Sequence, residues 1–159
     1  MSSDRRAGAI VLTIGAAITL VGTFLSWVAS GSTERSSYEV FGIVDRLGFS
    51  PDGVVGWALR VWPLVPLALV LTVIVHWAHH PSLRWPRHTV TSVAVLYPAV
   101  TSIALLNSPE VGLFRIGAGP WVTMAGTVVM FAGLATPTVL SATRRARSAA
   151  RAAPAGDRS

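Results

Sequence analysis

The hydrophobic positions of this chain gather into four long stretches, which cover residues 8–29, 54–78, 89–107 and 120–143. The first has no charged side chain, and at about 1.5 Å per residue its helix would reach roughly 33 Å, enough to cross a hydrocarbon core of about 30 Å. It is also longer than the apolar region of a signal peptide, about 7–15 residues, so we expect a retained span rather than a cleaved leader. The pattern predicts an all-α membrane protein with four transmembrane helices in a bundle.

A short amphipathic helix is predicted in the first outer loop, residues 30–53. Ser36 and Glu39 have the S-x-x-E spacing of a capping box, in which each side chain satisfies a backbone donor at a helix start. Apolar residues at helical spacing follow, so we expect a helix over about residues 37–47, on the outer membrane surface or over the mouth of the bundle. It is either a lid that joins two spans or a docking surface for a protein partner, whose candidate residues are Tyr38, Phe41, Val44 and Arg46.

Composition and charge favour the lipid bilayer over nucleic acid as the partner of this chain. It is 52% hydrophobic and 13% charged, with a mean hydropathy of +0.56, which is too apolar for a water-facing surface at this size. The arginines collect before the first span, in the turn 78–88 and in the tail 144–159, while most acidic side chains lie in the outer loops 30–53 and 108–119. The positive-inside rule then predicts a plasma-membrane protein with both termini in the cytoplasm and a disordered Arg-rich tail.

Glycines recur every seven residues in the first and the fourth stretch. A seven-residue period keeps small side chains on one stripe of a helix, where a neighbouring backbone can approach closely. We therefore predict that the first and fourth spans pack face to face, and that such seams also offer contacts to a protein partner or a second copy. The helix-packing candidates are Gly8, Gly15, Gly22, Gly119, Gly126 and Gly133.

The third stretch is the most polar of the four. It contains several Ser and Thr residues and a central proline, which removes one helical hydrogen bond and favours a kink. A polar, kinked span belongs inside a bundle rather than against lipid. The candidate polar interior comprises Tyr97, Pro98, Thr101 and Ser102.

Candidate chemistry is sparse. His76, His79 and His80 share one helical face and form a weak metal-binding candidate, although they more simply end a helix near its negative pole. No Asp or Glu lies within a predicted span, which disfavours proton-coupled transport. The chain has no cysteine and no recognisable catalytic motif, so we expect no enzyme activity, no cofactor and no metal.

The segments FLSWVASGSTERSSYEVFGIVDRLG and GAGPWVTMAG resemble small uncharacterised multi-spanning membrane proteins of actinobacteria. The resemblance covers most of residues 24–126 and implies an actinobacterial plasma membrane, but it assigns no activity. From the residues themselves, the leading hypothesis is a non-enzymatic accessory or scaffold subunit of a membrane or envelope complex. The alternative is a small transporter or lipid-handling protein that works through the polar third span.

Overall fold

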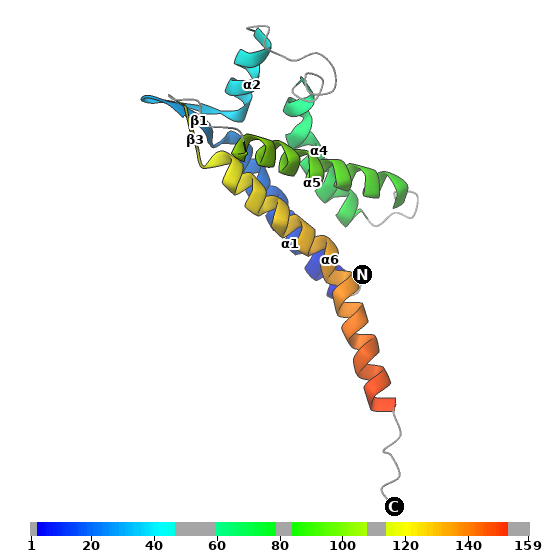
Figure 1. Ribbon diagram of the computed structural model, residues 1–159. Helices are drawn as coiled ribbons and strands as arrows, with labels where there is room; N and C mark the ends of the chain where they lie inside the picture. The colour runs from blue at the N-terminus through cyan, green and yellow to red at the C-terminus, as the bar shows by residue number, and fades with distance from the viewer. Residues whose placement is uncertain (1–2, 47–59, 79–83, 108–113, 153–159) are drawn as a thin grey trace, which may run out of the picture.

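The computed structural model describes residues 3–46, 60–78, 84–107 and 114–152 of the chain, which are mostly helical (Figure 1). The α-helices in these residues are α1 (Ser3–Phe24), α2 (Ser37–Arg46), α4 (Val65–Trp77), α5 (Arg84–Leu106) and α6 (Gly119–Ala152). A 3-10 turn, η1 (Trp62–Leu64), precedes α4, and three short strands complete the fold: β1 (Ser26–Ser30), β2 (Thr33–Ser36) and β3 (Phe114–Ile116).

Three of the described helices, α1, α5 and α6, are long and apolar enough to cross a membrane, so the chain is a membrane protein. The shorter apolar unit formed by η1 and α4 runs from Trp62 to Trp77, which corresponds to about 25 Å and falls short of a core of about 30 Å. Residues 54–59, with which the predicted second span begins, lie outside the described part of the chain. A fourth span therefore stays a prediction.

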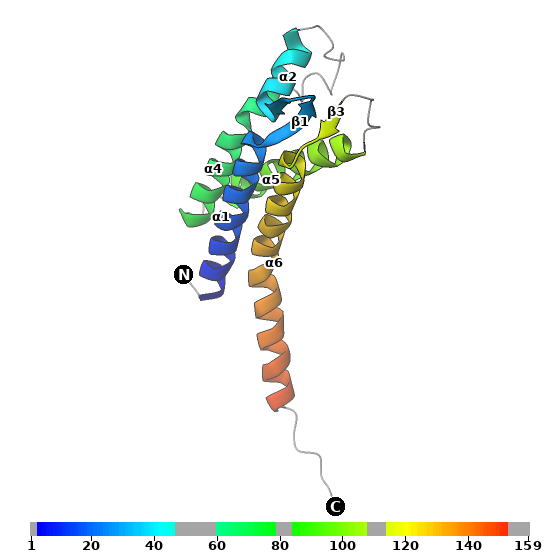
Figure 2. The same ribbon diagram turned by 90° about the vertical axis from the view of Figure 1, so that its left-hand side faces the viewer.

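The helices α1 and α6 run antiparallel and make the most extensive contact between any two elements (Figure 2). A Cβ atom built on Gly15 would lie 2.5 Å from the amide nitrogen of Met130, and one built on Gly133 would lie 2.5 Å from that of Leu12. Only glycine lets two backbones approach this closely. The first and last helices thus pack face to face, as the seven-residue glycine period predicts. Gly22 and Gly126 lie in the same contact.

Beyond Phe24 the chain forms a small sheet that the hydropathy pattern did not predict. Strand β1 pairs antiparallel with β2 on one side and with β3 on the other, in the order β2-β1-β3. Gly31 forms the β1–β2 turn at φ +59°, a conformation that favours glycine. The predicted end of the first span at residue 29 is therefore wrong, because a short apolar strand cannot be told from the end of an apolar helix by hydropathy alone.

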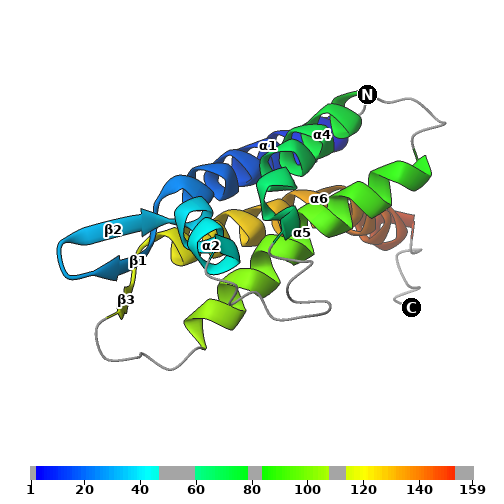
Figure 3. The ribbon, with the colours of Figure 1, turned by 90° about the horizontal axis from the view of Figure 1, so that it is seen from above.

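Helix α5 crosses the α1–α6 pair at a wide angle, and α4 packs against both α1 and α5 (Figures 1 and 3). Seen from above, α2 lies over the end of the helices from which the sheet also projects (Figure 3). α5 continues as a helix through Pro98. The described helices therefore consist of a tight antiparallel pair with α4 and α5 laid against it, rather than of four nearly parallel rods.

The predicted disorder of the tail from residue 144 is wrong for residues 144–152, which extend α6 to Ala152. Alanine and arginine have high helix propensity, and lengthening an existing helix avoids the unfavourable nucleation step. Residues 153–159 lie outside the described chain. Because α1 and α6 are antiparallel, the start of α1 and the end of α6 lie at the same end of the molecule (Figure 1).

Candidate functional site

The predicted amphipathic helix is present as α2, and its first turn has the Glu39 half of the predicted capping box. The carboxylate of Glu39 accepts hydrogen bonds from the backbone N–H of Ser36 at 2.8 Å and from the Ser36 hydroxyl at 3.1 Å. These two donors, the backbone amide first, hold the pKa of the Glu39 carboxyl below its usual 4.5. The capping-box spacing in the sequence therefore located the start of α2 correctly.

The inner side of α2 is hydrogen-bonded to the end of α1. The hydroxyl of Ser37, a fully buried residue, donates to the carbonyl oxygen of Thr23 at 2.6 Å and accepts from Nε1 of Trp62 at 2.9 Å. The hydroxyl of Tyr38 donates to Oγ1 of Thr23 at 3.2 Å, and burial raises the pKa of the Tyr38 phenol. One short segment of α2 thus links α1 to the turn that precedes α4.

An aromatic cluster fills the space beneath α2. Trp27 from β1, Phe41 from α2 and Trp62 from η1 form three edge-on pairs, with ring centroids 5.0 to 5.9 Å apart. Tyr97 of α5 lies against Trp62 at 5.6 Å. Such pairs add about 0.5–1.5 kcal/mol each beyond the burial of their surface. The cluster therefore joins elements from four parts of the chain into one cap over the helices.

The structure places two of the four residues of the predicted partner surface, Tyr38 and Phe41, against this cap. Tyr38 and Phe41 pack against their own chain, Arg46 is exposed, and the side chain of Val44 is not among those described. This arrangement favours the lid over the docking surface as the role of α2. The glycine seams are likewise occupied within the chain, where α1 meets α6. Gly8 is buried in this contact, whereas Gly119 packs against the ring of Trp27.

The predicted polar interior of α5 lies near the same cap, and its residues are not among those that line the cavity described below. Pro98 is fully buried, and the half-buried Tyr97 contacts Trp62. The hydroxyl of Thr101 donates to the carbonyl oxygen of Tyr97 at 2.9 Å. Ser102 is 0% exposed, and its hydroxyl has no hydrogen-bond partner among the described residues. These four residues serve the packing of α5 against its neighbours.

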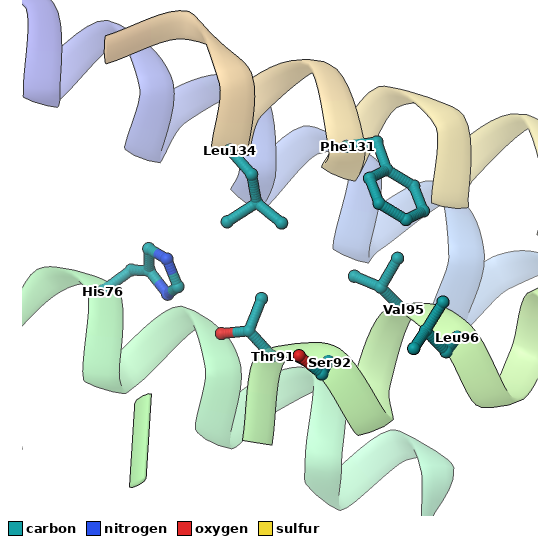
Figure 4. A pocket seen from close by; sticks show the side chains of 7 residues that line it. All are labelled: His76, Thr91, Ser92, Val95, Leu96, Phe131 and Leu134. Carbon is teal, nitrogen blue, oxygen red and sulfur yellow. The ribbon is translucent and has the colours of Figure 1, made fainter. Parts of the chain in front are cut away.

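A cavity of about 330 Å³ lies between α4, α5 and α6, toward the end at which α1 begins (Figure 4). Its size falls within the range of small-molecule pockets, about 300–1,000 Å³. Three helices contribute to the wall, and Leu96 and Phe131, each about half exposed, form its open rim. The lining residues are His76, Thr91, Ser92, Val95, Leu96, Phe131 and Leu134.

Both polar and apolar side chains line this cavity. Val95, Leu96 and Phe131 lie at one end, whereas Leu134 faces Thr91 at the other end, on which Ser92 and His76 also lie (Figure 4). Thr91 is 5% exposed, and its hydroxyl oxygen is buried without a hydrogen-bond partner among the described residues, so that oxygen is not open to the cavity. A site lined by both polar and apolar side chains suits an amphiphilic molecule.

His76 is held in place by its own helix. Its Nδ1 lies 2.9 Å from the carbonyl oxygen of Thr72, and since a carbonyl only accepts, Nδ1 carries the hydrogen. His79 and His80, the other members of the predicted metal-binding group, lie outside the described residues. Within the described chain, no three side chains of His, Cys, Asp or Glu come close enough to hold a metal ion.

The polar candidates from the sequence lie on α5, the helix that also contributes four residues to the cavity, but they do not include Thr91 and Ser92. Thr91 and Ser92 are visible in the sequence as polar residues of the third stretch, yet the central proline drew attention to Tyr97 and Ser102, one to three turns away. The cavity depends on the wide crossing of α5, which no local pattern encodes.

Comparisons with family models, with curated proteins and with solved structures find no match to this chain.

Proposed function

We propose that this protein is a non-enzymatic, lipid-handling membrane protein that binds one amphiphilic molecule between α4, α5 and α6. The observation that carries the proposal is the cavity of about 330 Å³, which polar and apolar side chains of three helices line together. A ligand with both a polar group and an apolar part would contact both kinds of side chain there. Of the two functions that the sequence suggested, this is the one that works through the polar α5.

An accessory or scaffold role, the leading hypothesis from the sequence, now has less support. It rested on glycine seams and on the apolar side of α2 as contact surfaces for a partner. The glycine seams, and Tyr38 and Phe41 of α2, are already packed against other parts of the same chain. A partner would have to bind elsewhere, for example on the exposed apolar faces of the spans, which in a membrane protein ordinarily face lipid.

The test is to purify the protein from native membranes in a mild detergent and to weigh the intact complex by native mass spectrometry. We expect about one lipid-sized molecule per chain. The variant Leu134→Trp, which fills the cavity, should lose it, while Leu140→Trp, on the same helix but outside the cavity, should keep it. Equal occupancy in the two variants would overturn the proposal, and a stoichiometric protein partner without lipid would restore the accessory role.

A further inference from the structure

We infer that the cavity opens sideways into the hydrocarbon of the bilayer, between α5 and α6, and that its ligand is a membrane-dissolved amphiphile whose acyl chain enters by this opening. This inference rests on the proposed function and specifies the class and the route of its ligand. The opening is formed by two apolar side chains, Leu96 of α5 and Phe131 of α6, which line the cavity and are 53% and 49% exposed. Both lie at the same end of the cavity (Figure 4). A ligand at this end therefore meets whatever surrounds the two helices.

The helices α6 and α1 set the depth of this opening in the membrane. Phe131 is the central residue of the apolar segment Gly119–Thr143, about 18 Å along the helix from either end. The preceding residue, Met130, packs against Gly15, which lies near the middle of residues 8–24 of α1, a segment without a charged side chain. A hydrocarbon core of about 30 Å that is centred on these two spans encloses the opening. The rim therefore lies in hydrocarbon, away from both aqueous faces.

The surface around the opening is apolar and faces outward. On α5, Val93 and Val100 lie about one turn to either side of Leu96, and each is more than half exposed. On α6, Val128 lies about one turn before Phe131 and is also more than half exposed. Neither of the two apolar segments contains a charged side chain. The cavity therefore opens onto the lipid-facing surface, and a polar ligand from water would have to cross hydrocarbon to reach it, which is unfavourable.

The lining of the cavity indicates how such an amphiphile would lie. Of the polar lining residues, Ser92 is exposed, whereas His76 and Thr91 are buried. Ser92 precedes Leu96 by about one turn of α5, or about 6 Å along the helix axis. A polar group of the ligand would thus contact Ser92, and its chain would pass between Leu96 and Phe131 into the bilayer. A volume of about 330 Å³ holds the polar group and the first part of one chain.

Spin-label accessibility tests whether the opening faces hydrocarbon. The chain has no native cysteine, so a nitroxide can be attached to Leu96→Cys alone, in protein reconstituted into phosphatidylcholine vesicles. Collisions are measured with oxygen, which dissolves in hydrocarbon, and with the nickel complex of ethylenediaminediacetate, which stays in water. We expect Leu96→Cys to match Val100→Cys on the outward face of α5, with frequent collisions with oxygen and few with nickel. Thr33→Cys, exposed in β2, should show the reverse.

A substitution that closes the rim tests whether the chain enters by this opening. Leu96→Trp places a larger ring opposite Phe131, whereas the matched control Val100→Trp adds the same ring on the outward face of α5, away from the cavity. Both variants are purified from native membranes, and the lipid-sized molecule that remains bound is counted by native mass spectrometry. We expect Leu96→Trp to lose most of this molecule and Val100→Trp to keep it.

The outcomes separate the inference from the function on which it rests. If the nickel complex reached Leu96→Cys as often as Thr33→Cys, the opening would face water and the inference would be overturned, while loss of the bound molecule in Leu134→Trp would still support an amphiphile-binding cavity. Full retention in Leu96→Trp, with loss in Leu134→Trp, would likewise overturn entry between α5 and α6 alone. Retention in both of these Trp variants would overturn the inference and the proposed function together.

Discussion

Replacing Gly15 by alanine tests whether the α1–α6 contact is the rigid part of this protein. Gly15 lies in the middle of α1, and the added Cβ would lie 2.5 Å from the amide nitrogen of Met130 and 2.8 Å from the carbonyl oxygen of Gly126. Both atoms belong to the backbone of α6, so no side chain can rotate to make room. Ordinary contacts begin at 3.4 Å, so the two helices would have to separate by about 0.9 Å.

The expected cost follows from two opposing terms. Overpacking a close contact costs about 1–3 kcal/mol, whereas alanine improves helix propensity over glycine by up to about 1 kcal/mol. We therefore expect Gly15→Ala to lower the free energy of unfolding by about 1–2 kcal/mol. Gly42→Ala is the matched control, because Gly42 lies inside α2 and a Cβ there has nothing within 4 Å. It should raise the free energy of unfolding by about 0.5–1 kcal/mol.

Reversible unfolding of purified protein by SDS titration, followed by far-ultraviolet circular dichroism, measures both variants. The two alanine substitutions should shift the midpoint in opposite directions, and the difference between them isolates the steric cost of the contact. If Gly15→Ala shifted the midpoint in the same direction and by the same amount as Gly42→Ala, the close approach of α1 and α6 would be refuted.

Two further predictions concern the cap. Ser37→Ala leaves the carbonyl of Thr23 and the indole N–H of Trp62 buried without their partner, so SDS titration should show that the free energy of unfolding falls by about 2–4 kcal/mol. The exposed control Thr143→Ala should change the free energy of unfolding by less than about 0.5 kcal/mol. Because the pKa of Glu39 is lower in the folded protein than its usual value of 4.5, the stability that its hydrogen bonds contribute is present above pH 4.5 and is lost as the pH falls through the pKa of the folded state. The stability that native protein gains over Glu39→Ala should therefore be larger at pH 6 than at pH 3, and an equal difference at both values would contradict the cap.

The parts of the fold that follow from local pattern were predictable. The apolar lengths of α1, α5 and α6 predict membrane helices, and the glycine period predicts the contact between the first and the last. The spacing of Ser36 and Glu39 predicts the start of α2. Each of these features is encoded in the spacing of residues along a continuous stretch of sequence, without reference to a distant segment.

The parts that depend on pairing between distant segments were not predictable. Strand β1 exists because β3, more than eighty residues later, pairs with its other edge. Trp27 and Trp62 come from separate segments, β1 and η1, and are buried against each other in the cap, a contact that no local pattern encodes. The cavity beside Thr91 has the same origin, because it depends on the angle at which α5 crosses α6 and not on the composition of either helix.

The contrast between the two ends of α5 bears on what the protein does. Near the cap, Pro98 and Ser102 are buried away from the cavity, and at Gly15, Gly22, Gly126 and Gly133 the α1–α6 contact has no room for a methyl group. At the other end of α5, the cavity leaves three helices incompletely packed, which costs stability. An unpaired hydroxyl does not distinguish this end, because those of Ser26, Ser102 and Thr123 are also buried without a partner among the described residues. A chain that served only as a rigid frame would gain by filling the cavity, so the open volume between α4, α5 and α6 is what favours a ligand there.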